Sequence, residues 1–212
     1  MYDSNMKKSL SVMLAVGLFL ASPAFSLSDN NLSGRKIVID AGHGGTALGS
    51  TECPGLPEKD ATLDIAFRLK ALLEIAGATA YMTRTDDRTL SNADRYNFAN
   101  STNGEVLVSI HLNGSTNHAV DGTQGLYGKR NKDLEFTKVL HNRLAAELGV
   151  PDNRVTNFAS GVLLKSNMPA TIQETVFISN TTECGLLTDG TGNRQQAIAQ
   201  SLFNGLNDWF GR

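Results

Sequence analysis

Two histidines and two glutamates have the types and positions that metal-assisted hydrolysis requires. His43 lies in a glycine-rich segment directly after a short apolar run, and His111 ends a second apolar run. Glu58 opens a segment with helical periodicity, and Glu174 lies within an otherwise apolar strand pattern. Two imidazoles and a carboxylate are typical ligands of a catalytic zinc ion, whose fourth position stays open for water. We therefore expect His43, Glu58 and His111 to bind Zn2+ and Glu174 to act as the base.

Each proposed ligand also has an ordinary structural interpretation when it is taken alone. His43 could be a turn histidine, because glycines surround it. Glu58 could serve only as a favourable charge at the N-terminus of a helix. His111 could be a buried histidine whose ring nitrogens form hydrogen bonds with other groups in the core. The metal hypothesis depends on the three residues occurring together.

Glu174 is informative because the residues around it are apolar. An unpaired carboxylate in such a strand is costly to bury, and burial raises its pKa. A raised pKa suits a general base that works near neutral pH. The structural alternative is an ion pair of Glu174 with Arg84 or Lys165.

Apolar periodicity and turn residues predict strands that alternate with helices along the chain. Ser91 is the expected N-cap of the second helix, and Gly77 and Gly149 are expected to close the first and third helices. This order predicts an α/β three-layer sandwich with a mixed, mostly parallel sheet flanked by helices. The expected strands are 36–40, 79–83, 105–111, 125–127, 161–165 and 170–177, and the expected helices are 58–75, 91–99, 133–148 and 194–209.

The strand ends are where such a sheet would assemble a site. Open α/β sheets bind ligands at the carboxyl ends of their strands, and His43, His111 and Glu174 each lie at or near such an end. Residues 112–124 lack apolar periodicity and are expected to form a surface loop. The other two histidines, His118 in this loop and His141 on the third helix, are expected to be solvated.

The N-terminus has the pattern of an export signal. A basic pair, Lys7 and Lys8, precedes an apolar run over 10–21 and a short segment of small residues, with cleavage expected after Ser26. The apolar run is shorter than the roughly 18 residues of a membrane-spanning helix, so an uncleaved anchor is the weaker alternative. We expect residues 1–26 to be a signal peptide, 27–34 a short tether and 35–212 a single catalytic domain. The mature protein would then have no membrane span and act outside the cytoplasm, in a periplasm rather than the medium.

Charge and cysteine content narrow the expected partners. The chain of 212 residues has a formal net charge of −2 and no dense run of Lys and Arg, which argues against a nucleic-acid partner. We expect a monomer. The two cysteines, Cys53 and Cys184, would meet oxidising conditions after export, and the sequence leaves open whether they form a disulfide or remain two free thiols.

The motifs taken together resemble one enzyme family. Over nearly all of residues 35–210 the chain resembles the zinc-dependent N-acetylmuramoyl-L-alanine amidases of the amidase type 3 family, which are cell-wall hydrolases. The resemblance implies a phosphorylase/hydrolase-like fold. The motifs that carry it are 37–45, 58–60, 83–84, 109–113, 168–170 and 174–180, in the family's order and spacing.

The resemblance implies a substrate and assigns roles. The substrate would be peptidoglycan or a muropeptide, cut at the amide bond between N-acetylmuramic acid and L-alanine of the stem peptide. Zinc binding falls to the two histidines and to Glu58, and the catalytic role to Glu174. Asn113 and Arg84 are the candidates for substrate contact.

Three features bear on how this chain would differ from its family. Ala41 stands where the family commonly has proline, which would loosen a turn. Val176 stands where it commonly has a small residue, and its bulk could narrow the site. Segment 112–124 is too short to hold the inhibitory helix that cell-division members insert after the second histidine. An open site that needs no activator is therefore expected.

Three other functions compete with this interpretation. Gly42, Gly44 and Ala47 fit a dinucleotide-binding fingerprint, but such loops run straight into a helix and Pro54 and Pro57 intervene here. A zinc metallocarboxypeptidase would use the same ligand types, usually with the first histidine and glutamate in one short motif. A non-catalytic peptidoglycan-binding domain would keep the fold without turnover.

Overall fold

A six-stranded mixed sheet forms the centre of the computed structural model, which describes residues 30–212. The strand order is β2-β1-β3-β6-β4-β5. Neighbouring strands from β2 to β6 are parallel, β4 is antiparallel to β6, and β5 is parallel to β4. The strands are β1 (Lys36–Ala41), β2 (Thr79–Met82), β3 (Val106–Asn113), β4 (Thr123–Tyr127), β5 (Asp152–Asn157) and β6 (Ala170–Phe177).

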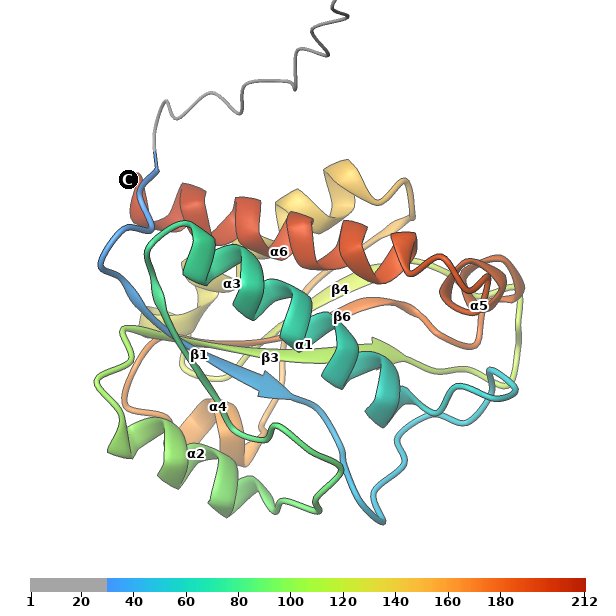
Figure 1. Cartoon of the computed structure of the whole chain (residues 1–212), viewed down its shortest axis with the longest axis horizontal. Helices are drawn as coiled ribbons and strands as arrows, with labels where there is room; N and C mark the ends of the chain where they lie inside the picture. Colours follow the sequence, from blue (N-terminus) through green and yellow to red (C-terminus); the bar gives the residue numbers. More distant parts are fainter. Residues whose placement is uncertain (1–29) are drawn as a thin grey trace, which may run out of the picture.

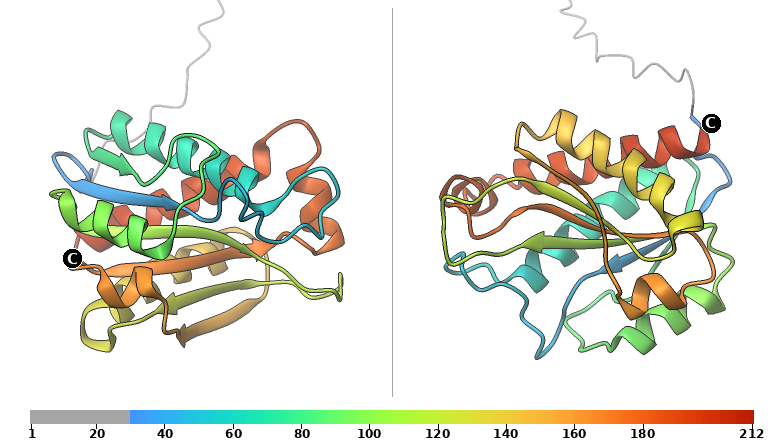
Figure 2. Two further views of the ribbon diagram at one scale, coloured as in Figure 1. Left: turned by 90° about the horizontal axis from the view of Figure 1, so that it is seen from below. Right: turned by 180° about the vertical axis from the view of Figure 1, so that it is seen from behind.

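Helices cover both faces of this sheet (Figure 1). Helices α1, α3 and α6 lie on one face, and the shorter α2 and α4 lie on the other, as the views from below and behind also show (Figure 2). The helices are α1 (Glu58–Ile75), α2 (Asn92–Ser101), α3 (Arg130–Glu147), α4 (Gly161–Lys165), α5 (Thr181–Leu187) and α6 (Asn193–Phe210). The predicted α/β three-layer arrangement is confirmed.

Two hydrophobic cores separate the layers because side chains alternate across the central strands. Val38 packs in the core beneath α2 and α4, whereas Ile37 and Ile39 on the same strand pack beneath α1, α3 and α6. A strand buried on both faces has a continuous apolar sequence rather than an alternating one, which explains the runs that predicted β1 and β3. The central strands are therefore held rigidly where they reach the site.

Local signals account for several element boundaries. Ser91 caps α2 in a capping box, in which its side chain accepts from the Asp94 backbone and the Asp94 side chain accepts from the Ser91 backbone. Gly77 directly follows Ala76, the C-cap residue of α1. Its φ is +81°, a left-handed conformation that glycine adopts without a steric cost. These predicted helix ends are confirmed.

Two expectations about elements are corrected by the structure. Residues 161–165 were predicted as a strand but form helix α4. The prediction was wrong because a five-residue apolar run is too short for its periodicity to distinguish a buried strand from a single helical turn. Strand β5 was not predicted, because this edge strand is largely exposed and its sequence is polar. Helix α5 was also not predicted.

The predictions for the N-terminus fall mostly outside the described residues. The expected signal peptide, 1–26, and most of the tether, 27–34, precede residue 30. Within residues 30–212 no helix has both the length and the apolar character needed to cross a membrane.

Candidate active site

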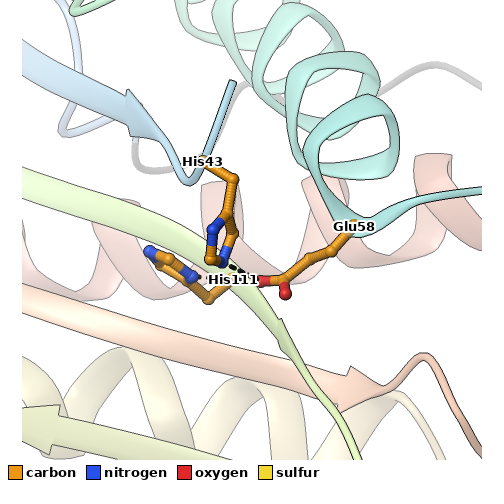
Figure 3. A group of neighbouring side chains, drawn as sticks. All are labelled: His43, Glu58 and His111. Carbon is orange, nitrogen blue, oxygen red and sulfur yellow. Dashed lines mark hydrogen bonds and ion pairs between the residues drawn. The ribbon is translucent and has the colours of Figure 1, made fainter. Parts of the chain in front are cut away.

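The three predicted metal ligands lie together at the ends of β1, β3 and the start of α1 (Figure 3). Their ligand atoms are all within 4.8 Å of one another. Glu58 Oε1 lies 3.1 Å from His43 Nε2 and 3.0 Å from His111 Nδ1. The side chains of His43 and His111 are 28% and 21% exposed, so the cluster is accessible from one side. The predicted convergence of these residues is confirmed.

The backbone around His43 has the unusual shape that this convergence requires. His43 has a φ of +58°, a left-handed conformation that is unfavourable for a residue with a side chain. A Cβ on Gly42 would lie 2.6 Å from ring atoms of His111, and one on Gly49 would lie 2.5 Å from Glu58 Oε2. Only glycine at these two positions lets the loop approach the ligands so closely.

A buried ion pair under the loop holds His43 in place. The Asp40 carboxylate accepts from Arg95 Nη1 at 2.7 Å, Thr83 Oγ1 at 2.6 Å and Ser109 Oγ at 2.7 Å. Arg95 also donates through Nη2 to the His43 carbonyl at 2.7 Å. Burial alone would raise the pKa of Asp40, but the charge of Arg95 and these hydrogen bonds outweigh it and hold the pKa below its usual value.

Arg84 supports the same loop and does not line the site. It is 2% exposed, and its guanidinium donates to the carbonyls of Ala41, Gly42 and Lys59 at 3.0, 2.8 and 2.7 Å. The expectation that Arg84 contacts substrate is therefore corrected, because its donors are directed to the main chain. Arg84 is a positioning residue.

Glu58 is held as an anion by its surroundings. Burial opposes ionisation, but hydrogen bonds and charges from His111 and His43 outweigh it and keep the pKa of Glu58 well below its usual value. The backbone N–H groups of Leu112 and Ser50 donate to its two oxygens at 3.0 and 2.9 Å. A fixed carboxylate beside two imidazoles is the donor set that zinc prefers.

Glu174 faces the cluster from the neighbouring strand. It pairs in register with His111 on β3 and lines the same groove as His43 and His111. Burial raises its pKa; the charge of Glu58 adds to this effect, and those of His111 and His43 oppose it. Within residues 30–212 the Glu174 carboxylate has no ion-pair partner. The alternative interpretation, an ion pair with Arg84 or Lys165, is therefore wrong.

The groove is about 660 Å³ and opens on the sheet face that carries α2 and α4. Asn113 lines it, as expected of a substrate contact, and accepts through Oδ1 from the Gly114 backbone at 2.9 Å. Val176 does not line it: this residue is fully buried in the core on the α1 side. A register irregularity between His111 and Asn113 accompanies this change of face. Val176 therefore adds no bulk to the lining of the groove.

A disulfide joins the loop before α1 to helix α5. Cys53, in the loop that leads to Glu58, is bonded to Cys184 on α5, with a Cα–Cα distance of 5.5 Å. The open question about the cysteines is thus answered in favour of a bridge.

The two remaining histidines differ from each other. His118 is exposed in the loop after β3, as expected. His141 is 2% exposed, and its Nε2 lies 2.7 Å from Asp152 Oδ1 on the unpredicted strand β5. The expectation that His141 is solvated is wrong, because the face of α3 that carries it packs against the sheet.

Comparison with known proteins identifies this combination of fold and site. The family model described as N-acetylmuramoyl-L-alanine amidase matches residues 37–208. The germination-specific N-acetylmuramoyl-L-alanine amidase of Bacillus subtilis is 31% identical over 91% of this chain and 90% of that protein. N-acetylmuramoyl-L-alanine amidase LytC of the same organism is 30% identical over 85% of this chain, which spans only 36% of LytC.

Solved structures agree with the sequence comparison. The catalytic domain of CwlV from Bacillus (Paenibacillus) polymyxa superimposes with a TM-score of 0.78 at 28% identity, over 84% of this chain and 98% of that one. AmiC2 of Nostoc punctiforme gives a TM-score of 0.78 at 29% identity, over 85% and 99% of the two chains. The fold and the His-Glu-His cluster define an α/β enzyme with a metal-type ligand group. The chain belongs to the N-acetylmuramoyl-L-alanine amidase family.

Family membership also decides between the competing interpretations. The glycine-rich segment after β1 forms an isolated bridge between Gly44 and Ala47, and the next helix begins only at Glu58. A dinucleotide loop would open the helix directly, so that interpretation is wrong. The metallocarboxypeptidase interpretation is likewise contradicted by the family match.

Proposed function

We propose that this protein is a zinc-dependent amidase that hydrolyses the bond between N-acetylmuramic acid and the L-alanine of the stem peptide, with Glu174 as general base. The observation that carries the proposal is the grouping of His43 Nε2, His111 Nδ1 and Glu58 Oε1 within 4.8 Å, with Glu174 beside His111 on the neighbouring strand and in the same groove. Relatives named for this activity support the choice of bond.

The three ligands fit zinc by their chemistry and by their accessibility. Two imidazole nitrogens and one carboxylate oxygen leave a position open, and the partly exposed histidines line the groove, which puts that position on the groove side. Zinc held there supplies Lewis acidity, which lowers the pKa of water and stabilises negative charge on a carbonyl oxygen. The hydrogen bonds of Glu58 to the Leu112 and Ser50 backbone keep the carboxylate oriented for this role.

Glu174 handles the proton in this mechanism. Its carboxylate accepts a proton from the attacking water, and burial, which raises the pKa of Glu174, makes this carboxylate a stronger base than an exposed one. The same carboxylate then delivers the proton to the departing alanine nitrogen, which leaves as an amine. Strand pairing with β3 and β4 fixes the position of Glu174 next to His111.

The groove is uncovered in this structure, which supports activity without an activator. The loop 114–122 turns away toward α5, where the backbone of Ser115 donates to Ser179 Oγ at 2.9 Å and Thr181 donates to the His118 carbonyl at 3.2 Å. No residue of this loop is among those lining the groove. The described residues therefore hold no segment that blocks entry.

The disulfide supports export of the protein, because such bonds persist mainly in oxidising compartments. We propose that residues 1–26 direct the chain out of the cytoplasm and that it acts on the cell wall there. Intact-mass measurement of the protein recovered from the cell envelope tests this, since cleavage after Ser26 predicts a mature chain that begins at Leu27. A mass equal to that of the full chain would contradict it.

The activity is tested by digestion of purified sacculi and mass spectrometry of the new ends. Chelator-treated enzyme is expected to be inactive, and zinc alone should restore it, releasing peptides with a free L-alanine amino group. Glu174→Gln should retain zinc at the wild-type stoichiometry and lose about 10² to 10⁴ in rate, the usual contribution of a general base. Sacculi with intact muramyl-alanine bonds would refute the proposed reaction. A requirement for a second protein would refute the proposed activity without an activator. Wall binding with no wild-type cleavage would instead indicate a non-catalytic domain.

A further inference from the structure

Three asparagines of the chain are followed directly by glycine: Asn103, Asn113 and Asn204. This dipeptide is chemically labile, because the glycine nitrogen can attack the side-chain amide of the asparagine and glycine has no side chain that hinders the ring closure. The fold gives the three pairs different surroundings. Of the three asparagines, Asn113 is the one that lines the groove with the proposed metal ligands.

The backbone nitrogen of Gly114 lies beside the amide that it would attack. Strand β3 ends at Asn113, whose carbonyl accepts from the Ile178 backbone at 2.9 Å. The next residue, Gly114, is exposed, and its N–H donates to Asn113 Oδ1 at 2.9 Å. Among the described residues this N–H has no other acceptor, so no strand pairing holds it away from the side chain. Two reacting groups kept this close favour an intramolecular reaction.

The pair in helix α6 lacks this freedom. Gly205 lies inside the helix, where its N–H is bonded to a carbonyl of the preceding turn. A Cβ on Gly205 would lie 2.9 Å from Leu140 Cα, so the backbone packs closely against α3. The Asn204 side chain is also held, because its Nδ2 donates to the two Glu147 oxygens at 3.2 and 3.1 Å. Ring closure at Asn204 would require the helix to open.

The pair at Asn103 lies at the opposite end of β3. Asn103 is exposed in the turn between α2 and β3, at the amino end of the strand. His111 and Asn113 are at the carboxyl end, where the groove is. A reaction at Asn103 therefore changes the surface far along the strand from the site, which makes this pair a matched comparison for Asn113.

We propose that Asn113 is a site of spontaneous deamidation in the folded protein and that the reaction inactivates the site as the protein ages. The Gly114 nitrogen forms a bond to Asn113 Cγ, the Cγ–Nδ2 bond breaks, and ammonia leaves with the proton of the Gly114 nitrogen. The product is a succinimide ring. Water then adds across one of the ring's C–N bonds. Opening at Cγ gives aspartate, and opening at the main-chain carbonyl carbon gives isoaspartate.

Both products change the groove. The asparagine amide can donate and accept hydrogen bonds, whereas a carboxylate is charged and only accepts them. The new charge lies on the same strand as His111 and in the groove that Glu174 also lines. In isoaspartate the main chain runs through the former side chain, so the carbonyl that accepts from Ile178 becomes part of a free carboxylate. Loss of activity is the expected result. This consequence rests on the amidase function proposed above, whereas the modification itself does not.

Peptide mapping of aged protein tests the modification. The purified protein is kept in alkaline or mildly acidic buffer, digested at acidic pH so that digestion adds no deamidation, and analysed by mass spectrometry and with an isoaspartate-specific methyltransferase. Modification of Asn113 should grow with time, and faster in alkali because the attacking nitrogen must lose its proton, while Asn204 stays intact. In guanidinium-unfolded protein Asn204 should react as well. An Asn113 that stays intact in the folded protein but reacts in the unfolded protein would overturn the proposal.

Variants test the effect on activity. The longer side chain of Asn113→Gln closes a larger ring more slowly, so its activity, relative to its own starting value, should stay constant while that of the wild type declines. Asn103→Gln is the matched control and should decline like the wild type. A decline that Asn113→Gln does not prevent would overturn the inactivation.

The wild type decides the question even if Asn113→Gln is inactive from the start. Its lost activity should equal the fraction of chains modified at Asn113, and full activity of modified protein would overturn the inactivation. Fresh wild type that fails to cleave sacculi with zinc would refute the proposed amidase function, and the peptide map would still test the modification.

Discussion

Replacing Asp40 by asparagine should show how strongly the buried ion pair supports the site. Asparagine has nearly the same shape, so the change removes the charge and replaces one accepting oxygen of the carboxylate with a donating amide group. The Arg95 guanidinium, 2.7 Å away and 5% exposed, is then left buried without its counter-ion. Breaking one partner of a buried pair costs about 3–5 kcal/mol, a large part of the roughly 5–15 kcal/mol that stabilises a typical domain.

Urea unfolding followed by circular dichroism measures this cost. Asp40→Asn is expected to lower the unfolding free energy by about 3–5 kcal/mol at pH 7. The double variant Asp40→Asn with Arg95→Met removes both charges and should be less destabilised than the sum of the single changes. Glu135→Gln is the matched control, because it makes the same substitution in the exposed pair with Lys138 and should leave unfolding unchanged.

The same variant should also weaken metal binding, because Arg95 holds the His43 carbonyl at 2.7 Å. Loss of groups that orient metal ligands typically lowers affinity about 10- to 100-fold. Competition with a chromogenic chelator measures the zinc affinity. If Asp40→Asn lowered the unfolding free energy by less than about 1 kcal/mol and left the zinc affinity unchanged, this role of the ion pair would be refuted. The buried charge of Arg95 would then be compensated by other groups.

Acid should expose the same interaction in the wild type. The folded pKa of Asp40 lies below its unfolded value of 3.8. Its stabilisation is therefore fully present above the unfolded pKa and is lost as pH falls below 3.8 toward the folded pKa. Wild type should lose unfolding free energy in this window, and Asp40→Asn should lack that component. Identical pH dependence for the two proteins would contradict the assignment.

Three further perturbations test the site from other directions. Changing Cys53 and Cys184 to serine should cost about 4–5 kcal/mol by loop closure, given their separation of 131 residues, and an unchanged Tm would contradict this role of the bridge. Gly42→Ala would place its Cβ 2.6 Å from the His111 ring and should weaken zinc binding at least about tenfold. Gly185→Ala, where a Cβ meets nothing within 4 Å, is its control, and equal zinc affinity of the two variants would show that Gly42 is not needed for close approach. Zinc at about 1,000 times its Kd should stabilise the wild type by about 4 kcal/mol in thermal unfolding, and an equal shift with magnesium would argue against a zinc-type site.

Much of the fold could be predicted because its signals are local. Strands β1 and β3 are buried on both faces, which gives them continuous apolar runs. Helix α1 is buried on one face, which gives it a helical apolar period. The residues at the strand ends could be grouped because parallel strands end at the same edge of a sheet. Helix α4 and strand β5 were missed because one is too short to show a period and the other is a polar edge strand.

The supporting residues of the site were beyond sequence reasoning. Asp40 was read only as the end of a strand, and nothing in the sequence near Arg95 indicates that its guanidinium reaches back to Asp40 and His43. Likewise, no local pattern shows that Arg84 turns toward main-chain carbonyls. Such contacts join residues more than 40 positions apart, and only the packing of the loops brings them together.

The sequence by itself determined which groups can do the chemistry. Two imidazoles and two carboxylates, placed at strand ends and at a helix start, already specified a metal-type hydrolytic site, because ligand type and strand direction are written locally. The tertiary structure decided which of the polar groups line the groove and which hold the main chain around it. It left the Glu174 carboxylate without an ion-pair partner among the described residues and directed the Arg84 guanidinium to main-chain carbonyls. It also closed the disulfide and placed Val176 in the core. These outcomes depend on burial and on distances between remote segments, which a linear pattern does not contain.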